Sequence, residues 1–141
     1  AQTYADCGFI KDHDQRALCR AKDSQSSGQC GFIRDSDLRS YCRAIVKQHQ
    51  SQCGFIRNSD LRNACRSEVG GSNSGGNCGF IRNSDQRALC RAKKDKSSGQ
   101  CGFIRDSDLR SYCRAIISKN SSKCGFINAR DLRSRCRVEI P

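Results

Sequence analysis

The chemistry with the strongest signal in this sequence is that of arginine. Two arginines lie four residues apart in every copy of a short motif, as Arg39 and Arg43 do, so on a helix they would share one face. Guanidinium groups in such a stripe bind phosphate, sulfate or carboxylate groups. The chain has 26 Lys and Arg against 14 Asp and Glu, a net charge of +12, which favours an anionic partner.

The first arginine of each pair also has a structural interpretation. An aspartate precedes it by two residues in every copy, so Arg39 can pair with the equivalent of Asp37 in a neighbouring copy or with Asp35 in its own. We predict inter-repeat ion pairs for these residues and a polyanion-binding surface for the second arginines, together with the more variable Arg34, Arg57, Arg82 and Arg105. The ion-pair set is Asp14, Arg16, Asp37, Arg39, Asp60, Arg62, Asp85, Arg87, Asp108, Arg110, Asp131 and Arg133, and the polyanion set is Arg20, Arg43, Arg66, Arg91, Arg114 and Arg137.

Metal and catalytic chemistry fit the sequence poorly. Asp35-Ser36-Asp37 resembles the start of a calcium loop, but Arg39 occupies the fifth position, where an oxygen ligand is needed. One cysteine pair per copy gives two zinc ligands where a structural site needs four. His13 and His49 lie at non-equivalent places, and no repeated nucleophile and base accompany them. We therefore expect no enzyme activity, no metal, no cofactor and no small-molecule substrate.

The cysteines reveal the repeat. Six copies begin at Cys7, Cys30, Cys53, Cys78, Cys101 and Cys124, and each has its second cysteine twelve residues later, whereas the spacing between copies varies. The constant spacing favours a disulfide within each copy over one between copies. Twelve cysteines without a C-x-x-C pair suit an oxidising compartment, outside the cell or in the periplasm, and the start at Ala1-Gln2 is what cleavage of a signal peptide leaves. The predicted pairs are Cys7–Cys19, Cys30–Cys42, Cys53–Cys65, Cys78–Cys90, Cys101–Cys113 and Cys124–Cys136.

The six copies also follow a longer sequence period. The first three copies map onto the last three with a constant offset of 71 residues, which indicates that a three-repeat block was duplicated. We expect repeats 1–3 in residues 1–69, a Gly/Ser joint in residues 70–77 and repeats 4–6 in residues 78–141.

The elements that carry these residues are short helices. Asp or Asn stands five residues after the first cysteine in five copies (Ala129 in the sixth), where it would cap a helix such as residues 36–46. The Cys-Gly-Phe-Ile segment before it predicts a turn or one helical turn. We expect the invariant glycine, Gly31 in the second copy, to need a positive φ or a closely packed backbone. Phe32 lies inside the disulfide loop, which predicts a core position.

These elements predict an all-α fold of six disulfide-stapled units of about 23 residues, stacked as in a solenoid because no unit can bury its apolar residues alone. The first and last copies are barely capped, so the chain could join head to tail into a homopolymer. We expect a secreted, non-enzymatic structural protein, a self-assembling extracellular fibre or matrix subunit. The alternative is a cationic binding or defence protein that acts on anionic polysaccharide, lipid or nucleic acid.

Overall fold

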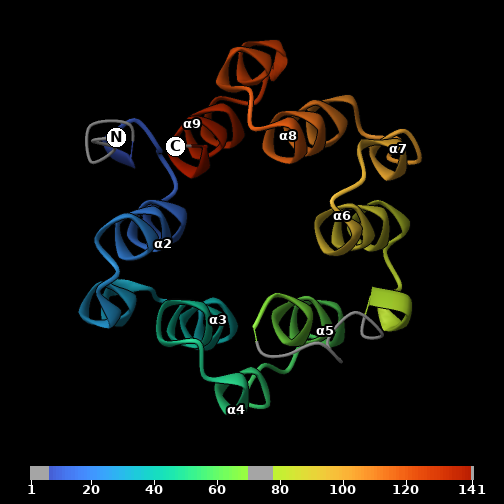
Figure 1. Cartoon of the computed structure of the whole chain (residues 1–141). Helices are drawn as coiled ribbons and strands as arrows, with labels where there is room; N and C mark the ends of the chain where they lie inside the picture. The colour runs from blue at the N-terminus through green and yellow to red at the C-terminus, as the bar shows by residue number, and fades with distance from the viewer. Residues whose placement is uncertain (1–6, 70–77, 141) are drawn as a thin grey trace.

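The computed structural model describes residues 7–69 and 78–140, which fold into a closed ring of helices (Figure 1). Six longer helices stand side by side around a central axis, and shorter helical turns lie outside them. The described residues contain no β-strand, so the all-α prediction is confirmed. The longer helices are α2 (His13–Ser24), α3 (Ser36–Lys47), α5 (Ser59–Glu68), α6 (Ser84–Asp95), α8 (Ser107–Ser118) and α9 (Arg130–Glu139). The short elements are η1 (Ser27–Phe32), α4 (Gln50–Cys53), α7 (Ser98–Cys101) and η3 (Ser121–Phe126).

Each longer helix begins where its capping residue predicts. In α3, the Asp35 side chain accepts a hydrogen bond of 2.8 Å from the Leu38 N–H, which satisfies one of the free donors of the first turn. The equivalent Asp or Asn caps α2, α5, α6 and α8, whereas Ala129 makes no such bond at the start of α9. Four helices end at a non-glycine residue with positive φ: Gln25, Gln48, Lys96 and Lys119.

Every copy closes its own disulfide. The cysteine before the longer helix joins the one in its second turn, with Cα atoms 5.6–5.8 Å apart, and all twelve cysteines are paired. These are the pairs that the constant spacing of twelve residues predicts. The invariant isoleucine three residues after the first cysteine, Ile33 in the second copy, is buried between neighbouring units with the disulfide. Covalent and apolar contacts therefore hold the short turn of each repeat against its longer helix.

A repeated hydrogen-bond motif links each repeat to the next and closes the ring. The carboxylate of Asp37 accepts from the backbone N–H groups of Arg57 and Asn58 in the following repeat. All six copies make this pair of bonds, at 2.7–3.2 Å. In the last copy, Asp131 accepts from Lys11 and Asp12 of the first repeat. The two complementary ends predicted from the sequence thus meet within one chain, where α9 also contacts α2.

The core divides into two halves that follow the duplicated blocks. One large apolar cluster lies within repeats 1–3 and an equivalent one within repeats 4–6. Two small clusters occupy the seams between the halves: Ile10 and its disulfide pack against Val138, and Ile81 and its disulfide pack against Ala64. The predicted joint at 70–77 lies outside the described residues.

Candidate binding surface

The described chain does not form the predicted Asp–Arg ion pairs. The prediction is wrong about the groups that these side chains bind. The first arginine of each copy bonds to backbone carbonyls of its own repeat: Arg39 Nη1 donates to the Ile33 carbonyl at 2.8 Å and to the Arg34 carbonyl at 3.3 Å. All six copies repeat this geometry, at 2.7–2.9 Å and 3.2–3.3 Å. The invariant aspartate and the first arginine of each copy are both structural, but each side chain binds backbone groups rather than the other side chain.

Four of the aspartates, Asp14, Asp37, Asp60 and Asp85, are held ionised by those backbone donors. For Asp37, the N–H groups of Arg57 and Asn58 hold the pKa of the carboxyl below its ordinary value, and burial opposes them only weakly. The pKa values of Asp14, Asp60 and Asp85 are lowered in the same way. The largest cause is in each case the hydrogen bond from one backbone N–H of the following repeat, that of Arg34, Arg82 and Arg105 respectively.

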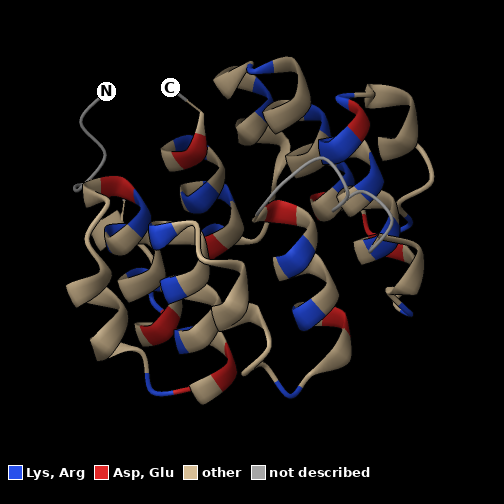
Figure 2. Cartoon of the chain, turned by 60° about the horizontal axis from the view of Figure 1, so that its bottom comes forward, with Lys and Arg blue, Asp and Glu red and all other residues tan. Residues whose placement is uncertain are grey.

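The second arginines lie towards the outside of the ring. Arg43, Arg91, Arg114 and Arg137 are exposed, and Arg20 and Arg66 are half-buried. Basic residues are distributed around the whole ring rather than gathered on one side (Figure 2). In three copies the guanidinium of the second arginine lies near the invariant glycine of its own repeat: a Cβ placed on Gly79 would be 3.9 Å from Arg91 Nη2.

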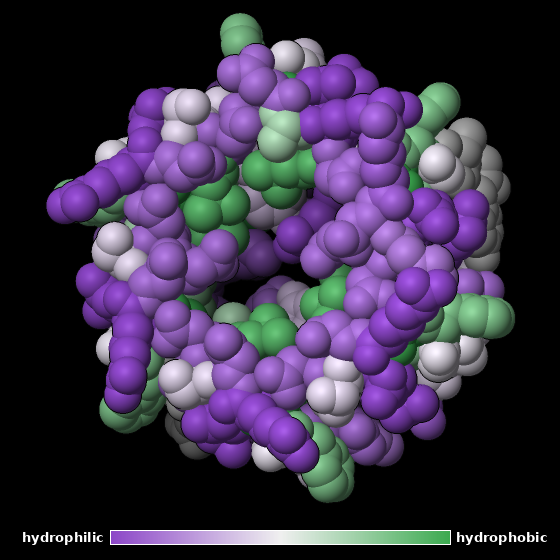
Figure 3. All heavy atoms as spheres, turned by 180° about the vertical axis from the view of Figure 1, so that it is seen from behind, coloured by the Kyte–Doolittle hydropathy of each residue, from purple (hydrophilic) through white to green (hydrophobic). Residues whose placement is uncertain are grey.

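The invariant phenylalanines are exposed, so the prediction that they belong to the core is wrong. Between 55% and 74% of each side chain is accessible, and hydrophobic side chains project from the outer edge of the ring (Figure 3). The isoleucine that follows each phenylalanine is buried instead, with 1% of its surface accessible. The six residues are Phe9, Phe32, Phe55, Phe80, Phe103 and Phe126.

The invariant glycine is also exposed, and the structure places no backbone demand on it. Gly54 has φ −64°, and a Cβ on Gly31 would meet no atom within 4 Å. The expected positive φ or close packing is therefore wrong. Neither Gly nor Phe at these two positions is required by the fold, yet neither changes in six copies.

Arginine and phenylalanine of adjacent repeats line one outer groove. Between the first two repeats, Arg16, Arg20 and Gln29 line a groove of about 310 Å³ together with Phe32. An aromatic face and a guanidinium thus lie side by side, an arrangement that can take a flat ring and a neighbouring anionic group at once. We call the exposed Gly-Phe pairs and the six second arginines the outer rim.

A second group of functional residues, on the axis of the ring, was missed by the sequence analysis. They occur 8, 11 and 15 residues after the first cysteine, a helical spacing, and their polarity varies between copies. That variability at inward positions, conserved under the 71-residue offset, is the signal that could have revealed them. The members that line the axial cavities are Gln15, Leu18, Lys22, Leu38, Tyr41, Ile45, Leu61, Ala64, Glu68, Gln86, Leu89, Lys93, Arg135 and Glu139.

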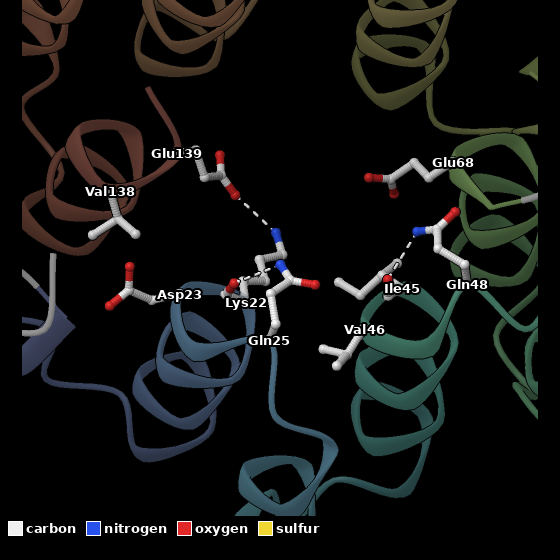
Figure 4. A pocket seen from close by; sticks show the side chains of 9 residues that line it. All are labelled: Lys22, Asp23, Gln25, Ile45, Val46, Gln48, Glu68, Val138 and Glu139. Atoms are coloured by element: carbon white, nitrogen blue, oxygen red, sulfur yellow. Dashed lines mark hydrogen bonds and ion pairs between the residues drawn. The ribbon is translucent and has the colours of Figure 1, made fainter. Parts of the chain in front are cut away.

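The axial charges form two related clusters. In one, Glu139 accepts from Lys22 at 2.8 Å, from Arg135 at 3.3 Å and from the Tyr112 hydroxyl. Burial alone would raise the pKa of Glu139, but Lys22 and Arg135 outweigh it and hold that pKa well below its usual range. Figure 4 shows Lys22 reaching Glu139 at one mouth of the axis, with Glu68 directed towards them from α5.

In the second cluster, Glu68 accepts from the Tyr41 hydroxyl at 2.7 Å and pairs with Lys93 at 3.5 Å. Burial would raise the pKa of Glu68, and the two lysines Lys93 and Lys22 lower it further than burial raises it. Burial likewise opposes the charge of Lys93, but Glu68 raises its pKa above the ordinary value. Both carboxylates are therefore ionised and Lys93 is charged near neutral pH.

Within residues 7–69 and 78–140, no group of three or more His, Cys, Asp or Glu side chains is placed to hold a metal ion. In the same residues, no helix combines the length and the apolar character that crossing a membrane requires.

Comparison with known proteins adds no functional information. No protein-family model matches the chain, and neither a curated protein nor a solved structure is significantly similar to it. The chemistry of the rim and of the axis is therefore the basis on which a function can be proposed.

Proposed function

We propose that this is a secreted cationic protein that binds an anionic polymer, an extracellular polysaccharide, along its outer rim. The observation that carries the proposal is the exposure of the Gly-Phe pair, which is identical in six copies although the fold requires neither residue. Six disulfides suit an oxidising environment, and the net charge of +12 attracts polyanions over a distance.

The shape of the rim favours a flexible polymer over a flat membrane. The phenylalanines project outward around the circumference, so a planar bilayer could touch only the few on one side at a time (Figure 3). A polymer chain can follow the circumference and engage the same Phe–Arg pair in successive repeats. Linked contacts of this kind gain affinity by effective concentration without any stronger single contact.

The head-to-tail filament is the less favoured function because its two ends are already joined. Asp131 binds the first repeat with the same two hydrogen bonds that join every other pair of neighbours. Self-association of the chain stays a prediction, and sedimentation of the purified protein tests it directly.

Heparin fractions of increasing length provide the test. We expect binding measured by calorimetry to strengthen with chain length until the polymer spans several repeats, and to weaken steeply with salt. A variant with all six rim phenylalanines replaced by serine should bind at least about tenfold more weakly, since each stacking contact contributes about 1 kcal/mol or more. Its melting temperature should change little because these side chains are exposed.

A charge-matched pair of variants separates the rim from net charge alone. Replacing the four exposed rim arginines by glutamine, and replacing four exposed arginines in the loops before the longer helices, each removes four charges. The rim variant should lose clearly more affinity than the loop variant. Equal losses, or full binding by the serine variant, would contradict a rim site. The sets are Arg43, Arg91, Arg114 and Arg137 for the rim and Arg34, Arg57, Arg82 and Arg105 for the loops.

A further inference from the structure

Among the axial residues, those 8, 11 and 15 positions after the first cysteine, one equivalent pair differs in kind between the two halves of the ring. The 71-residue offset pairs each axial residue with an equivalent one, so Tyr41 corresponds to Tyr112 and Glu68 to Glu139. Arg135 corresponds to Ala64, and this exchange breaks the symmetry. A cavity of about 570 Å³ lies where Ala64 leaves room, a size typical of small-molecule sites. A hollow is visible at the centre of the ring in Figure 3, with hydrophobic side chains on its wall.

The charged side chains on the wall of this cavity are bound by other groups of the protein. Three cations line it, Lys93, Lys94 and Arg135, against two carboxylates, Asp60 and Glu68. Asp60 is already bound by the backbone N–H groups of the next repeat, and Glu68 by Tyr41 and Lys93. Lys94 in turn donates to the Ser67 carbonyl at 3.2 Å, and Arg135 pairs with Glu139 at 3.3 Å. Each of the three cations therefore has a protein partner, and an anion in the cavity would need a donor that these partners leave open.

Arg135 is the cation best placed to receive that anion. Its Nε donates to Glu139 at 3.3 Å, and its guanidinium lies 5.3 Å from the centre of the Tyr112 ring. An arginine has five N–H donors, and in the described chain the Nη groups of Arg135 have no protein acceptor within hydrogen-bond distance. The side chain is 28% accessible and lines the cavity.

The apolar part of the wall is formed by leucines. Leu18, Leu38, Leu61 and Leu89 line the same cavity, from four of the helices around it. An occupant must therefore present an apolar body to the leucines and an anionic group to the cations.

We propose that the axial cavity binds a small amphipathic organic anion, a carboxylate whose apolar part lies among the leucines and whose head group contacts Arg135. This ligand site is separate from the outer rim and revises the expectation that the protein takes no small molecule. It does not depend on the proposed polymer binding, because no rim residue lines the cavity.

Three eight-carbon probes test the head group by calorimetry: octanoate, octanol and octylammonium. Octanoate should bind, octanol should bind more weakly because it lacks the charge, and octylammonium should not bind. Absence of octanoate binding, or octylammonium binding as tight as that of octanoate, would overturn the proposal. The serine variant of the rim phenylalanines should bind octanoate as the natural protein does, and loss of binding there would assign the fatty chain to the rim instead.

Two substitutions that already occur at this position elsewhere in the ring test the site. Arg135→Ala places the residue of the third repeat in the sixth and should weaken octanoate about tenfold or more, since a charge-assisted bond is lost. Arg130→Ala removes the same charge from an exposed position of the same helix and should leave the affinity unchanged. Ala64→Leu introduces the residue found at this position in the first and fourth repeats, and it should weaken octanoate and octanol together by filling the cavity. If either Arg135→Ala or Ala64→Leu binds octanoate as tightly as the natural protein does, while thermal melting shows that its fold is intact, the site is refuted.

Discussion

The contact that joins neighbouring repeats can be tested by changing one oxygen. Asp37 Oδ1 accepts from the Arg57 N–H at 2.9 Å, and Oδ2 accepts from the Asn58 N–H at 3.0 Å. In Asp37→Asn the shape is kept, but one acceptor becomes an NH₂ group that faces an N–H donor. The variant therefore loses one of the two bonds and gains a repulsion between donors.

The size of the effect follows from the exposure of these groups. A hydrogen bond to a charged group contributes about 1.5–3 kcal/mol when shielded from water. Both bonds of Asp37 are exposed, so water replaces much of what is lost, and about 0.5–1 kcal/mol per bond is a better value. With the repulsion added, we expect Asp37→Asn to lower the free energy of unfolding by about 1–2 kcal/mol, or the melting temperature by about 3–8 °C.

Thermal and urea unfolding measure this loss, with Asp95→Asn as the control. Asp95 is exposed near the end of α6, so the same change of charge there should alter stability by less than about 0.5 kcal/mol. A stability of Asp37→Asn equal to that of the control would refute the assigned role of the carboxylate. A loss well above 3 kcal/mol would instead support a buried ion pair between Asp37 and an arginine, which the described residues do not form.

Three further results are expected. The folded pKa values of four interface aspartates lie below the ordinary value of 3.8. The stabilisation that these carboxylates give is therefore complete above about pH 5 and is lost as the pH falls through 3.8 towards the lowered values. Melting curves between pH 6 and 2 should show this decline, and a flat profile would contradict it. Lys119→Gly should raise stability by about 0.5–1 kcal/mol in urea unfolding because φ there is 56°, whereas Ser118→Gly, inside the helix, should lower it. Gly31→Ala should leave the melting temperature within about 2 °C because the added Cβ meets open space, and a large drop would show a backbone demand that the structure lacks.

The sequence predicted the local structure well because local structure depends on local signals. The expected helix at residues 36–46 is Ser36–Lys47 in the structure, since Asp35 caps its start. The disulfides follow from a spacing that is constant within copies and variable between them.

The partners of the invariant charged residues could not be predicted in the same way. Asp37 and Arg39 looked like an ion pair because the sequence shows only side chains, whereas both bind backbone groups whose positions depend on the stacking of repeats. Phe32 looked buried because its neighbours in sequence are, and only the path of the short turn shows that it points outward. Closure of the ring depends on a rotation between neighbouring repeats that accumulates over six copies. No residue pattern encodes the angle of that rotation.

Closure also restricts how such a protein can arise and change. An open array can gain or lose single copies, since each new copy finds the same free end. In this ring, six copies complete the circle, so a chain of five or seven copies would bring Asp131 and Lys11 together only if every interface changed its angle. Copy number is therefore set by geometry, and the three-copy block is a semicircle. Duplicating a semicircle in one step completes the circle, which gives a physical reason for a duplication of three copies rather than of one.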